Sequence, residues 1–238
     1  MYNIYALLEE IRAEDKEYFL SSVPRYIRFQ KFIEKHSEGS SKEILDVGCS
    51  PGHLAISLAR MGHTVTGIDL NDEYLVKYPP AWLKEISRKL WNIENNRLDF
   101  EDERFDYILF TEILEHIAIT HPKYILSDLL RLLKPGGILY LTTPNVSNFT
   151  NLLQLLRNEN IFWDPDIFYD SLDRHNREYT SQDIKKILRD AGINNYDLRF
   201  FSTWGNTKHA PVRLIKFLID HNFNNRFLDN TIEVICKK

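Results

Sequence analysis

The amino-acid sequence predicts a doubly wound α/β fold with a seven-stranded, mostly parallel sheet. Apolar, strand-like runs alternate with amphipathic, helix-like segments over most of the chain. The 238 residues include 43% hydrophobic and 27% charged residues, which is the composition of an ordinary globular protein. The chain has only two cysteines, Cys49 and Cys236, which excludes a disulfide framework and a cysteine zinc cluster.

Residues 1–42 show helical periodicity and are expected to form an N-terminal helical cover. Apolar residues recur at helical spacing from residue 4 to 11 and again from 26 to 33, and we expect Pro24 to separate two helices. No stretch is apolar enough to span a bilayer, and the N-terminus lacks the features of a secretory signal. A cytoplasmic location follows as an expectation.

The α/β domain is expected to occupy residues 43–238, and it opens with a strand–helix–strand unit. Residues 43–47 form a buried strand pattern, 54–60 a helix pattern and 64–68 a second strand pattern. Later segments continue the alternation: strand 105–110, helix 124–133 closed by a Pro-Gly-Gly turn at 135–137, strand 138–142, helix 181–191 ending at Gly192, strand 196–201, helix 212–219 and strand 231–236.

Two stretches interrupt this alternation. Residues 71–90 contain Pro79-Pro80 where a plain helix is expected. Residues at about 145–174 form a long aromatic segment. Because loops at the carboxyl ends of strands carry substrate sites in such folds, the second stretch is expected to be an acceptor-side insertion.

A glycine turn follows the first strand, at residues 48–52. Asp46 precedes it, and Asp69 ends the next strand, where a carboxylate can accept the hydroxyls of a ribose. The GxGxxG pattern of dinucleotide sites is broken, with Ser50 and His53 in place of its second and third glycines. Asp46 would also repel a pyrophosphate, and it suits an ammonium or sulfonium group instead.

This turn resembles motif I of class I S-adenosylmethionine-dependent methyltransferases, which have a Rossmann-like fold. The span from about 44 to 193 is similar to the branch that includes ubiquinone-biosynthesis O-methyltransferases. Further segments match that branch in order: 92–100, 105–108, 112–117, 133–137, 143–145 and 175–193. The resemblance implies methyl transfer with S-adenosyl-L-methionine as cofactor. It leaves open a non-catalytic cofactor-binding regulatory module.

The resemblance also implies the cofactor-binding residues. Asp46 and the turn would hold the methionine part, Asp69 the ribose, and Asn92 the adenine amino group. Two residues depart from the family pattern, because Ser50 replaces a glycine and Asn92 replaces an aspartate. The complete implied set is Asp46, Gly48, Cys49, Ser50, Gly52, Asp69, Leu70, Asn92, Ile93 and Thr111.

Three residues are candidates for the catalytic groups: Glu112, His116 and His175. On a helix, Glu112 would lie near both Glu115 and His116, and the imidazole has a pKa near neutrality that suits a general base. A structural role for Glu115 and His116 at the strand–helix junction is the alternative.

Four of these residues also resemble a metal site. Glu112, Glu115, His116 and His175 are similar to the ligands of small-RNA 3′-terminal ribose 2′-O-methyltransferases, whose Thr-Pro-Asn motif recurs at 143–145. The His-x-x-His pair of those enzymes is absent at 173–177. We therefore expect no metal and keep metal-assisted RNA methylation as the alternative function.

The acceptor is expected to be a small molecule, with a hydroxyl of a sugar or biosynthetic intermediate as the methylated group. Net charge is −4 and the isoelectric point near 6.1, which argues against a nucleic-acid partner. Candidate acceptor-binding residues follow or lie within the aromatic insertion: Trp163, Tyr169, Arg177 and Tyr179. Oligomeric state is not predicted, and His53 and His63 are expected at the surface or at helix ends.

Overall fold

The computed structural model confirms the doubly wound seven-stranded sheet. It describes residues 1–238 except 71–78, 80, 96, 172–173 and 203–227. The strand order is β3-β2-β1-β4-β5-β7-β6. The strands are β1 (Glu43–Val47), β2 (Thr64–Asp69), β3 (Ser87–Leu90), β4 (Phe105–Thr111), β5 (Leu133–Pro144), β6 (Tyr196–Phe201) and β7 (Thr231–Lys237).

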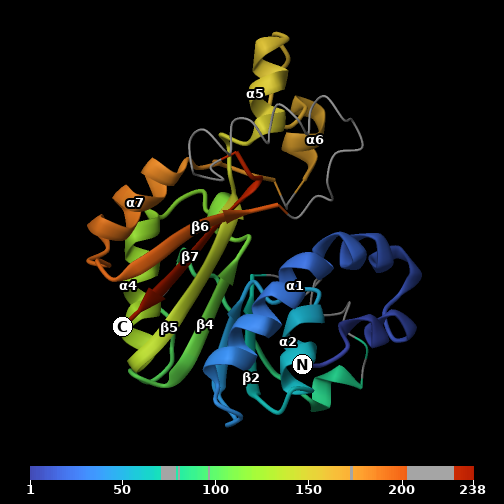
Figure 1. The fold of residues 1–238 in the computed structure, drawn as a ribbon, viewed down its shortest axis with the longest axis vertical. Helices are drawn as coiled ribbons and strands as arrows, with labels where there is room; N and C mark the ends of the chain where they lie inside the picture. The colour runs from blue at the N-terminus through green and yellow to red at the C-terminus, as the bar shows by residue number, and fades with distance from the viewer. Residues whose placement is uncertain (71–78, 80, 96, 172–173, 203–227) are drawn as a thin grey trace. The chain divides into compact units, whose positions relative to one another are not determined.

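Strand direction follows the expected mixed pattern. β1 pairs in parallel with β2 and with β4, and β2 pairs in parallel with β3. β6 and β7 are antiparallel neighbours, drawn in orange and red in Figure 1. The strand order reverses between β1 and β4, which is the point where open α/β sheets bind ligands at the carboxyl ends of their strands.

Ten helical segments connect these strands in the described part of the chain. They are η1 (Ile4–Glu9), η2 (Ala13–Asp15), α1 (Lys16–His36), α2 (His53–Ala59), η3 (Trp82–Lys84), η4 (Leu114–His116), α4 (Pro122–Leu132), α5 (Phe149–Leu156), α6 (Pro165–Asp170) and α7 (Ser181–Asp190). None of the described helices is long and apolar enough to cross a membrane. The cytoplasmic location stays a prediction.

The chain forms two compact units. The first contains Met1–Phe110, Asp128–Leu139 and Lys237–Lys238, and the second contains Thr111–Ser127 and Tyr140–Cys236. The glycine turn belongs to the first unit, and the candidate catalytic and acceptor-binding residues belong to the second. The expected division into a cover at 1–42 and a catalytic domain with an insertion stays a prediction.

Pro24 does not separate two helices, contrary to the sequence prediction. It lies inside the continuous helix α1. Proline removes one backbone hydrogen bond from a helix interior, but the apolar face of α1 continues past it. Val23 and Tyr26 are buried on either side of Pro24, as are Phe19 and Phe29 further along. Burial of this face offsets the missing bond, so tertiary packing overrides the local signal.

Three further local predictions need correction. The Pro-Gly-Gly turn at 135–137 lies within β5, where Gly136 N–H donates to the carbonyl of Lys238 and Lys238 N–H donates to Gly137. The 71–90 segment contains a strand, β3, that the sequence did not predict. The helix expected to contain Glu112 is a single 3₁₀ turn, η4. The helix expected at 212–219 lies outside the described residues.

Candidate active site

The glycine turn adopts backbone angles that favour glycine at two positions. Gly48 and Gly52 have φ angles of 73° and 85°, in the left-handed region that side chains disfavour. The N–H groups of Gly48 and Cys49 both donate to the carbonyl of Ile68 at the end of β2, at 2.8 and 3.1 Å. The turn is therefore fixed against the neighbouring strand.

The neighbouring strand is also packed closely against this turn. A Cβ placed on Gly67 would lie 2.6 Å from the Sγ of Cys49, which is closer than any ordinary contact. Cys49 is buried, so its thiol has little room to move away. Glycine at position 67 therefore helps to shape the turn, and no motif in the sequence indicated this role.

Asp69 is oriented by the turn itself. Its Oδ2 accepts a hydrogen bond from the N–H of Ser50 at 2.9 Å, and its Oδ1 accepts from the N–H of Leu70 at 2.7 Å. Ser50 contributes its backbone to this contact, so the serine in place of glycine leaves the contact intact. A carboxylate has about four lone-pair positions, so further hydroxyl donors can bind. Leu70, the next residue, is 65% exposed, and its contact with adenine stays a prediction.

Asp46 is a buried carboxyl group with a raised pKa. It is 3% exposed, and burial together with the nearby charge of Asp69 raises its pKa to about 7. A cationic group bound at this point would favour the charged carboxylate and offset the cost of burial. A ligand with an ammonium group would suit this position, and the role of Asp46 stays a prediction.

Asn92 makes a hydrogen bond within its own turn, and its contact with adenine stays a prediction. Its Oδ1 accepts a hydrogen bond from the N–H of Glu94 at 2.9 Å, within its own turn. That oxygen has a second lone pair, which an adenine amino group could use. Ile93, between them, is half-buried.

His53, the first residue of α2, is buried rather than exposed. Its ring is 2% exposed and lies among aromatic side chains of the same unit, with centroids 5.0 Å from Phe19, 6.0 Å from Trp82, 6.2 Å from Tyr26 and 6.3 Å from Tyr18. Burial lowers its pKa to about 4, so the imidazole is neutral near pH 7. Three of these aromatic rings come from α1. Through them, α1 packs against the start of α2, directly after the glycine turn.

His53 thus lies at a helix end, as expected, but it is not at the surface. His63 is likewise buried rather than at the surface. It is 9% exposed, and burial lowers its pKa. One feature of the sequence could have indicated that His53 is buried, namely its position directly after the glycine turn. The sequence offered no such feature for His63.

The second unit brings Glu115, His116 and His175 together. Each offers one potential ligand atom, and these atoms lie within 4.8 Å of one another. The two imidazoles meet edge to face, with centroids 5.1 Å apart. Trp163 lies against His175 at 5.1 Å, which places one predicted acceptor-binding residue beside the cluster.

Each side chain of the cluster is oriented by a hydrogen bond. His116 Nδ1 lies 3.0 Å from the carbonyl of Arg174, and His175 Nδ1 lies 3.0 Å from the Glu178 carboxylate. Thr143 Oγ1 donates to the Oε2 of Glu115 at 2.9 Å. A carbonyl and a carboxylate accept hydrogen bonds, so Nδ1 is the donor in both contacts, and in a neutral ring the lone pair would lie on Nε2.

The backbone holds the same arrangement. The N–H groups of Asn176 and Arg177 donate to the carbonyl of Glu115, at 2.7 and 3.2 Å. The Asn176 amide donates to the carbonyl of His116 at 2.7 Å. Segments far apart in the sequence are thereby fixed against each other.

Glu112 does not join this cluster. It follows Thr111, the last residue of β4, and its φ angle of 56° takes it out of the helical conformation on which the predicted spacing depended. Its N–H donates to the carbonyl of Thr142 at 2.9 Å. A non-glycine residue in the left-handed region is uncommon, and such strain is often found at functional sites.

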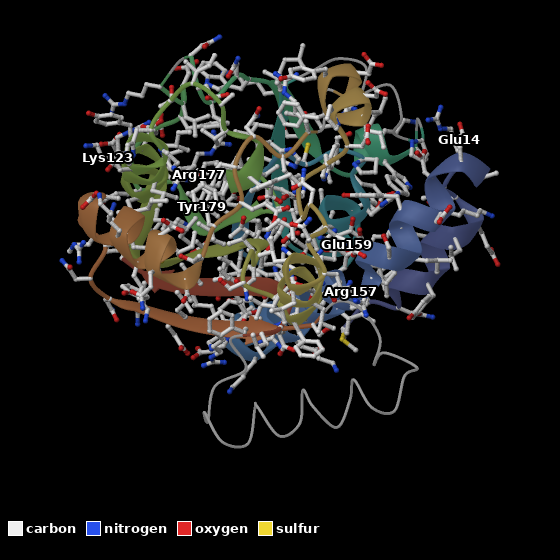
Figure 2. All side chains as sticks on the ribbon, turned by 90° about the horizontal axis from the view of Figure 1, so that it is seen from above. Glu14, Lys123, Arg157, Glu159, Arg177 and Tyr179 are labelled. Atoms are coloured by element: carbon white, nitrogen blue, oxygen red, sulfur yellow. The ribbon has the colours of Figure 1, made fainter. Side chains whose placement is uncertain are left out.

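The other acceptor-binding candidates divide between exposed and buried positions. The guanidinium of Arg177 lies over the ring of Tyr179, 5.4 Å from its centroid, and both are labelled in Figure 2. Tyr179 is 3% exposed, so it is largely covered by its neighbours. Tyr169 is 77% exposed, with its ring 5.2 Å from that of Phe168.

Residues 19–198 match the model of a family described as "Methyltransferase domain". This match covers most of the chain. The chain belongs to the methyltransferase domain family. The resemblance predicted from the glycine turn and the ordered segments is confirmed at this level, and the matched part includes every candidate site residue.

Curated relatives of this methyltransferase domain point to one branch. It is 31% identical over 133 residues to a ubiquinone biosynthesis O-methyltransferase of Coxiella burnetii (strain Dugway 5J108-111), covering 56% of each chain. It is 34% identical over 139 residues to the protein of that name from Idiomarina loihiensis, again covering 56% of each. The chain thus spans about half the length of the curated relatives it matches.

Solved structures confirm the class I methyltransferase fold. A SAM-dependent methyltransferase from Archaeoglobus fulgidus superposes with a TM-score of 0.62 at 18% identity, covering 93% of this chain and 99% of that one. Phosphoethanolamine N-methyltransferase 2 of Haemonchus contortus, solved with S-adenosyl-L-methionine, gives 0.55 at 18% identity, covering 83% of this chain and 48% of that one. At such identities the likeness concerns the fold.

Proposed function

We propose that this protein is an S-adenosylmethionine-dependent methyltransferase that methylates a hydroxyl oxygen of a small molecule. The observation that supports it best is the pair of carboxylates, Asp46 and Asp69, at the two sides of one glycine turn. The buried carboxyl fits an ammonium, and the oriented carboxylate beside it fits a ribose. Membership of the methyltransferase domain family supports the same cofactor.

The cofactor, when bound, supplies a methyl group on a positively charged sulfur that an acceptor oxygen displaces in line, leaving a neutral thioether. The residues of the chain must bind and orient the two reactants and accept one proton from the acceptor hydroxyl. We assign Asp46 to the ammonium, Asp69 to the ribose hydroxyls, and the backbone of residues 48–52 to the methionine part. Leu70, Asn92, Ile93 and Thr111 complete the proposed cofactor site.

A hydroxyl acceptor must lose its proton as the new carbon–oxygen bond forms. We assign this step to the cluster in the second unit. Within it, the imidazoles of His116 and His175 are the proposed general bases. Their Nδ1 contacts leave Nε2 as the basic atom of each ring. Glu112, which lies outside this cluster, is kept as a proposed catalytic residue on the grounds of its left-handed backbone.

An oxygen acceptor is favoured over nitrogen by the curated relatives, which are named O-methyltransferases. A small acceptor is favoured by the net charge of −4, because nucleic-acid binding draws on a basic surface. Trp163, Tyr169, Arg177 and Tyr179 are the proposed acceptor-binding residues, and Trp163 has the best support because it contacts His175. We propose a cytoplasmic site of action.

Calorimetry with S-adenosyl-L-methionine tests the cofactor part of this proposal. The wild-type chain should bind the cofactor, and Asp69→Ala should lower the affinity about tenfold or more, because hydrogen bonds to a charged group contribute about 1.5–3 kcal/mol. Asp99→Ala is the matched control, since that carboxylate is 80% exposed and pairs with Lys89. Equal affinities in wild type and Asp69→Ala would contradict the proposal.

A transfer assay with labelled cofactor tests the acceptor part. Polyhydroxylated small molecules should yield methylated product, whereas matched amines should not. Short RNA ends are included because the Glu115–His116–His175 cluster favours a metal-assisted ribose methyltransferase as second candidate. Methylation of RNA alone would favour that candidate. Cofactor binding without any product across the panel would favour a non-catalytic module.

A further inference from the structure

We infer that Arg131, in the last turn of α4, is a positioning residue for the adenine part of the cofactor. It acts through residues 91–104, the link between β3 and β4, which contains the proposed adenine-binding residues Asn92 and Ile93 near its start. This inference rests on the proposed function, and it adds a residue that no motif of the sequence indicated.

The link between β3 and β4 has little regular structure of its own. Its described residues, 91–95 and 97–104, form turns and irregular backbone and contain no helix, although a helix is the usual connection between parallel strands of one sheet. Leu98, in the middle of the link, is 3% exposed. Because buried backbone groups need hydrogen-bond partners, the link depends on partners from another element.

Two side chains of α4, one turn apart, supply these partners. Arg131 donates from Nη2 to the carbonyl of Leu98 at 2.8 Å and from Nη1 to the carbonyl of Phe100 at 2.9 Å. Asp128 accepts from the N–H of Leu98 at 2.7 Å and from the Nε of Arg131 at 2.9 Å. Both side chains lie largely out of the solvent, at 16% and 19% exposed, which strengthens these contacts.

Arg131 contacts the link at two further points. Its guanidinium pairs with the carboxylate of Asp102, and its own carbonyl accepts a hydrogen bond from the N–H of Glu103 at 3.0 Å. A guanidinium offers five donors in a fixed fork, whereas a lysine offers one compact ammonium. One arginine can therefore hold several points of the link at once, and a lysine cannot replace it fully.

Contacts between side chains carry this constraint toward the start of the link. The Nζ of Lys89 lies 5.5 Å from the ring centroid of Phe100 and 4.5 Å from that of Trp91. The N–H of Trp91 donates to the carbonyl of Asp69, the proposed ribose ligand, at 2.7 Å. A base attached to that ribose would meet the residues that follow Trp91. Arg131 is thus connected to the proposed adenine site by a continuous series of contacts.

This arrangement predicts which part of the cofactor depends on Arg131. The Oδ1 of Asn92 is the proposed acceptor for the adenine amino group. Its position decides whether adenine is distinguished from hypoxanthine, in which a carbonyl oxygen replaces that amino group. A loosened link should lower the affinity for adenine more than the affinity for hypoxanthine. A general loss of stability would lower both affinities alike.

Calorimetry with S-adenosyl-L-homocysteine and S-inosyl-L-homocysteine tests this selectivity. Wild type should bind the adenosyl compound about tenfold or more tightly than the inosyl compound. Arg131→Met should reduce this preference to about threefold or less, and Arg131→Lys should fall between the two. Arg189→Met is the matched control, because Arg189 also lies in the last turn of a helix, α7, but is exposed. It should keep the wild-type preference.

Amide hydrogen exchange of the free protein tests the contact between Arg131 and the link without any ligand. In Arg131→Met, residues 98–104 should exchange about tenfold faster than in wild type, while β1 and β2 exchange as before. Circular dichroism checks that the variants fold.

Unchanged exchange at residues 98–104 in Arg131→Met would overturn the inference. An equal loss of affinity for the two ligands, or a wild type without preference between them, would overturn it as well. A wild type that binds neither ligand would overturn the proposed function and the adenine role with it. The exchange measurement would then still show whether Arg131 holds the link, so the two failures are distinguishable.

Discussion

Asp46 shows how a single residue can set the conditions under which the protein works. Its burial and the adjacent charge of Asp69 keep its pKa near 7, more than two units above the ordinary range of an aspartate. The sequence predicted the acid and its partner from spacing alone. The burial that shifts its titration is visible only in the folded chain.

Cofactor affinity should therefore depend on pH. In the free protein, Asp46 is protonated below about pH 7, and an ammonium ligand requires the carboxylate. Affinity should weaken as pH falls through 7, approaching about tenfold per unit, and should level off above it. Calorimetry at several pH values, in buffers of different ionisation enthalpy, measures both the affinity and the proton released on binding.

Asp46→Asn separates this effect from titration of the ligand's own amine. The variant should bind S-adenosyl-L-methionine more weakly than wild type above pH 7. Below pH 7 its affinity should change less with pH. A wild-type affinity that is constant from about pH 5 to 8 would contradict the role assigned to Asp46.

At the scale of elements, local signals succeeded where burial is continuous. β1, β2 and β4 are apolar runs, and their predicted positions are confirmed within one residue at each end. β3 was missed because it pairs only with β2 at the sheet edge, and two of its four residues are basic. Its strand conformation comes from pairing with a neighbour rather than from its own pattern.

Helix α7 shows the clearest local signal. Thr180 and Asp183 form a capping box, in which Thr180 Oγ1 accepts from the N–H of Asp183 and the Asp183 carboxylate accepts from the N–H of Thr180. The helix ends before Gly192, whose φ of 79° is the left-handed conformation expected there. Ile184 and Leu188 lie on its buried face.

Removing this cap should destabilise the fold. Thr180→Ala should lower the free energy of unfolding by about 1 kcal/mol, because one N–H at the start of α7 loses its partner. Urea denaturation followed by circular dichroism measures this. Ser181→Ala, one residue further along the same helix, is the control and should change stability by less than about 0.5 kcal/mol. Equal effects of the two substitutions would show that the cap contributes nothing.

For the whole molecule, the family match and the seven-stranded order agree on one fold. Within that fold, cofactor binding should appear as a change in global stability, since a ligand that binds only the native state stabilises it by mass action. All the proposed cofactor-binding residues except Thr111 belong to the first unit, whose sheet strands, α1 and α2 contribute much of the buried core.

S-adenosyl-L-methionine at a hundred times its dissociation constant should stabilise the native state by about 2.7 kcal/mol. For a chain of this length, that corresponds to a rise in Tm of about 5–10 °C. Differential scanning fluorimetry over a series of concentrations measures the shift. Asp69→Ala at the same concentrations should shift less, and an unchanged Tm in wild type would argue that the cofactor does not bind.

The sequence by itself determined the α/β class, the glycine turn, its two carboxylates and the family. These depend on residues that are close in the chain or on strand patterns with a fixed period. Only the tertiary structure decided that Pro24 lies within one helix, that His53 is enclosed by aromatic rings and that His175 joins Glu115 and His116. Each of these depends on packing between distant segments, whose burial and hydrogen bonds outweigh local preference.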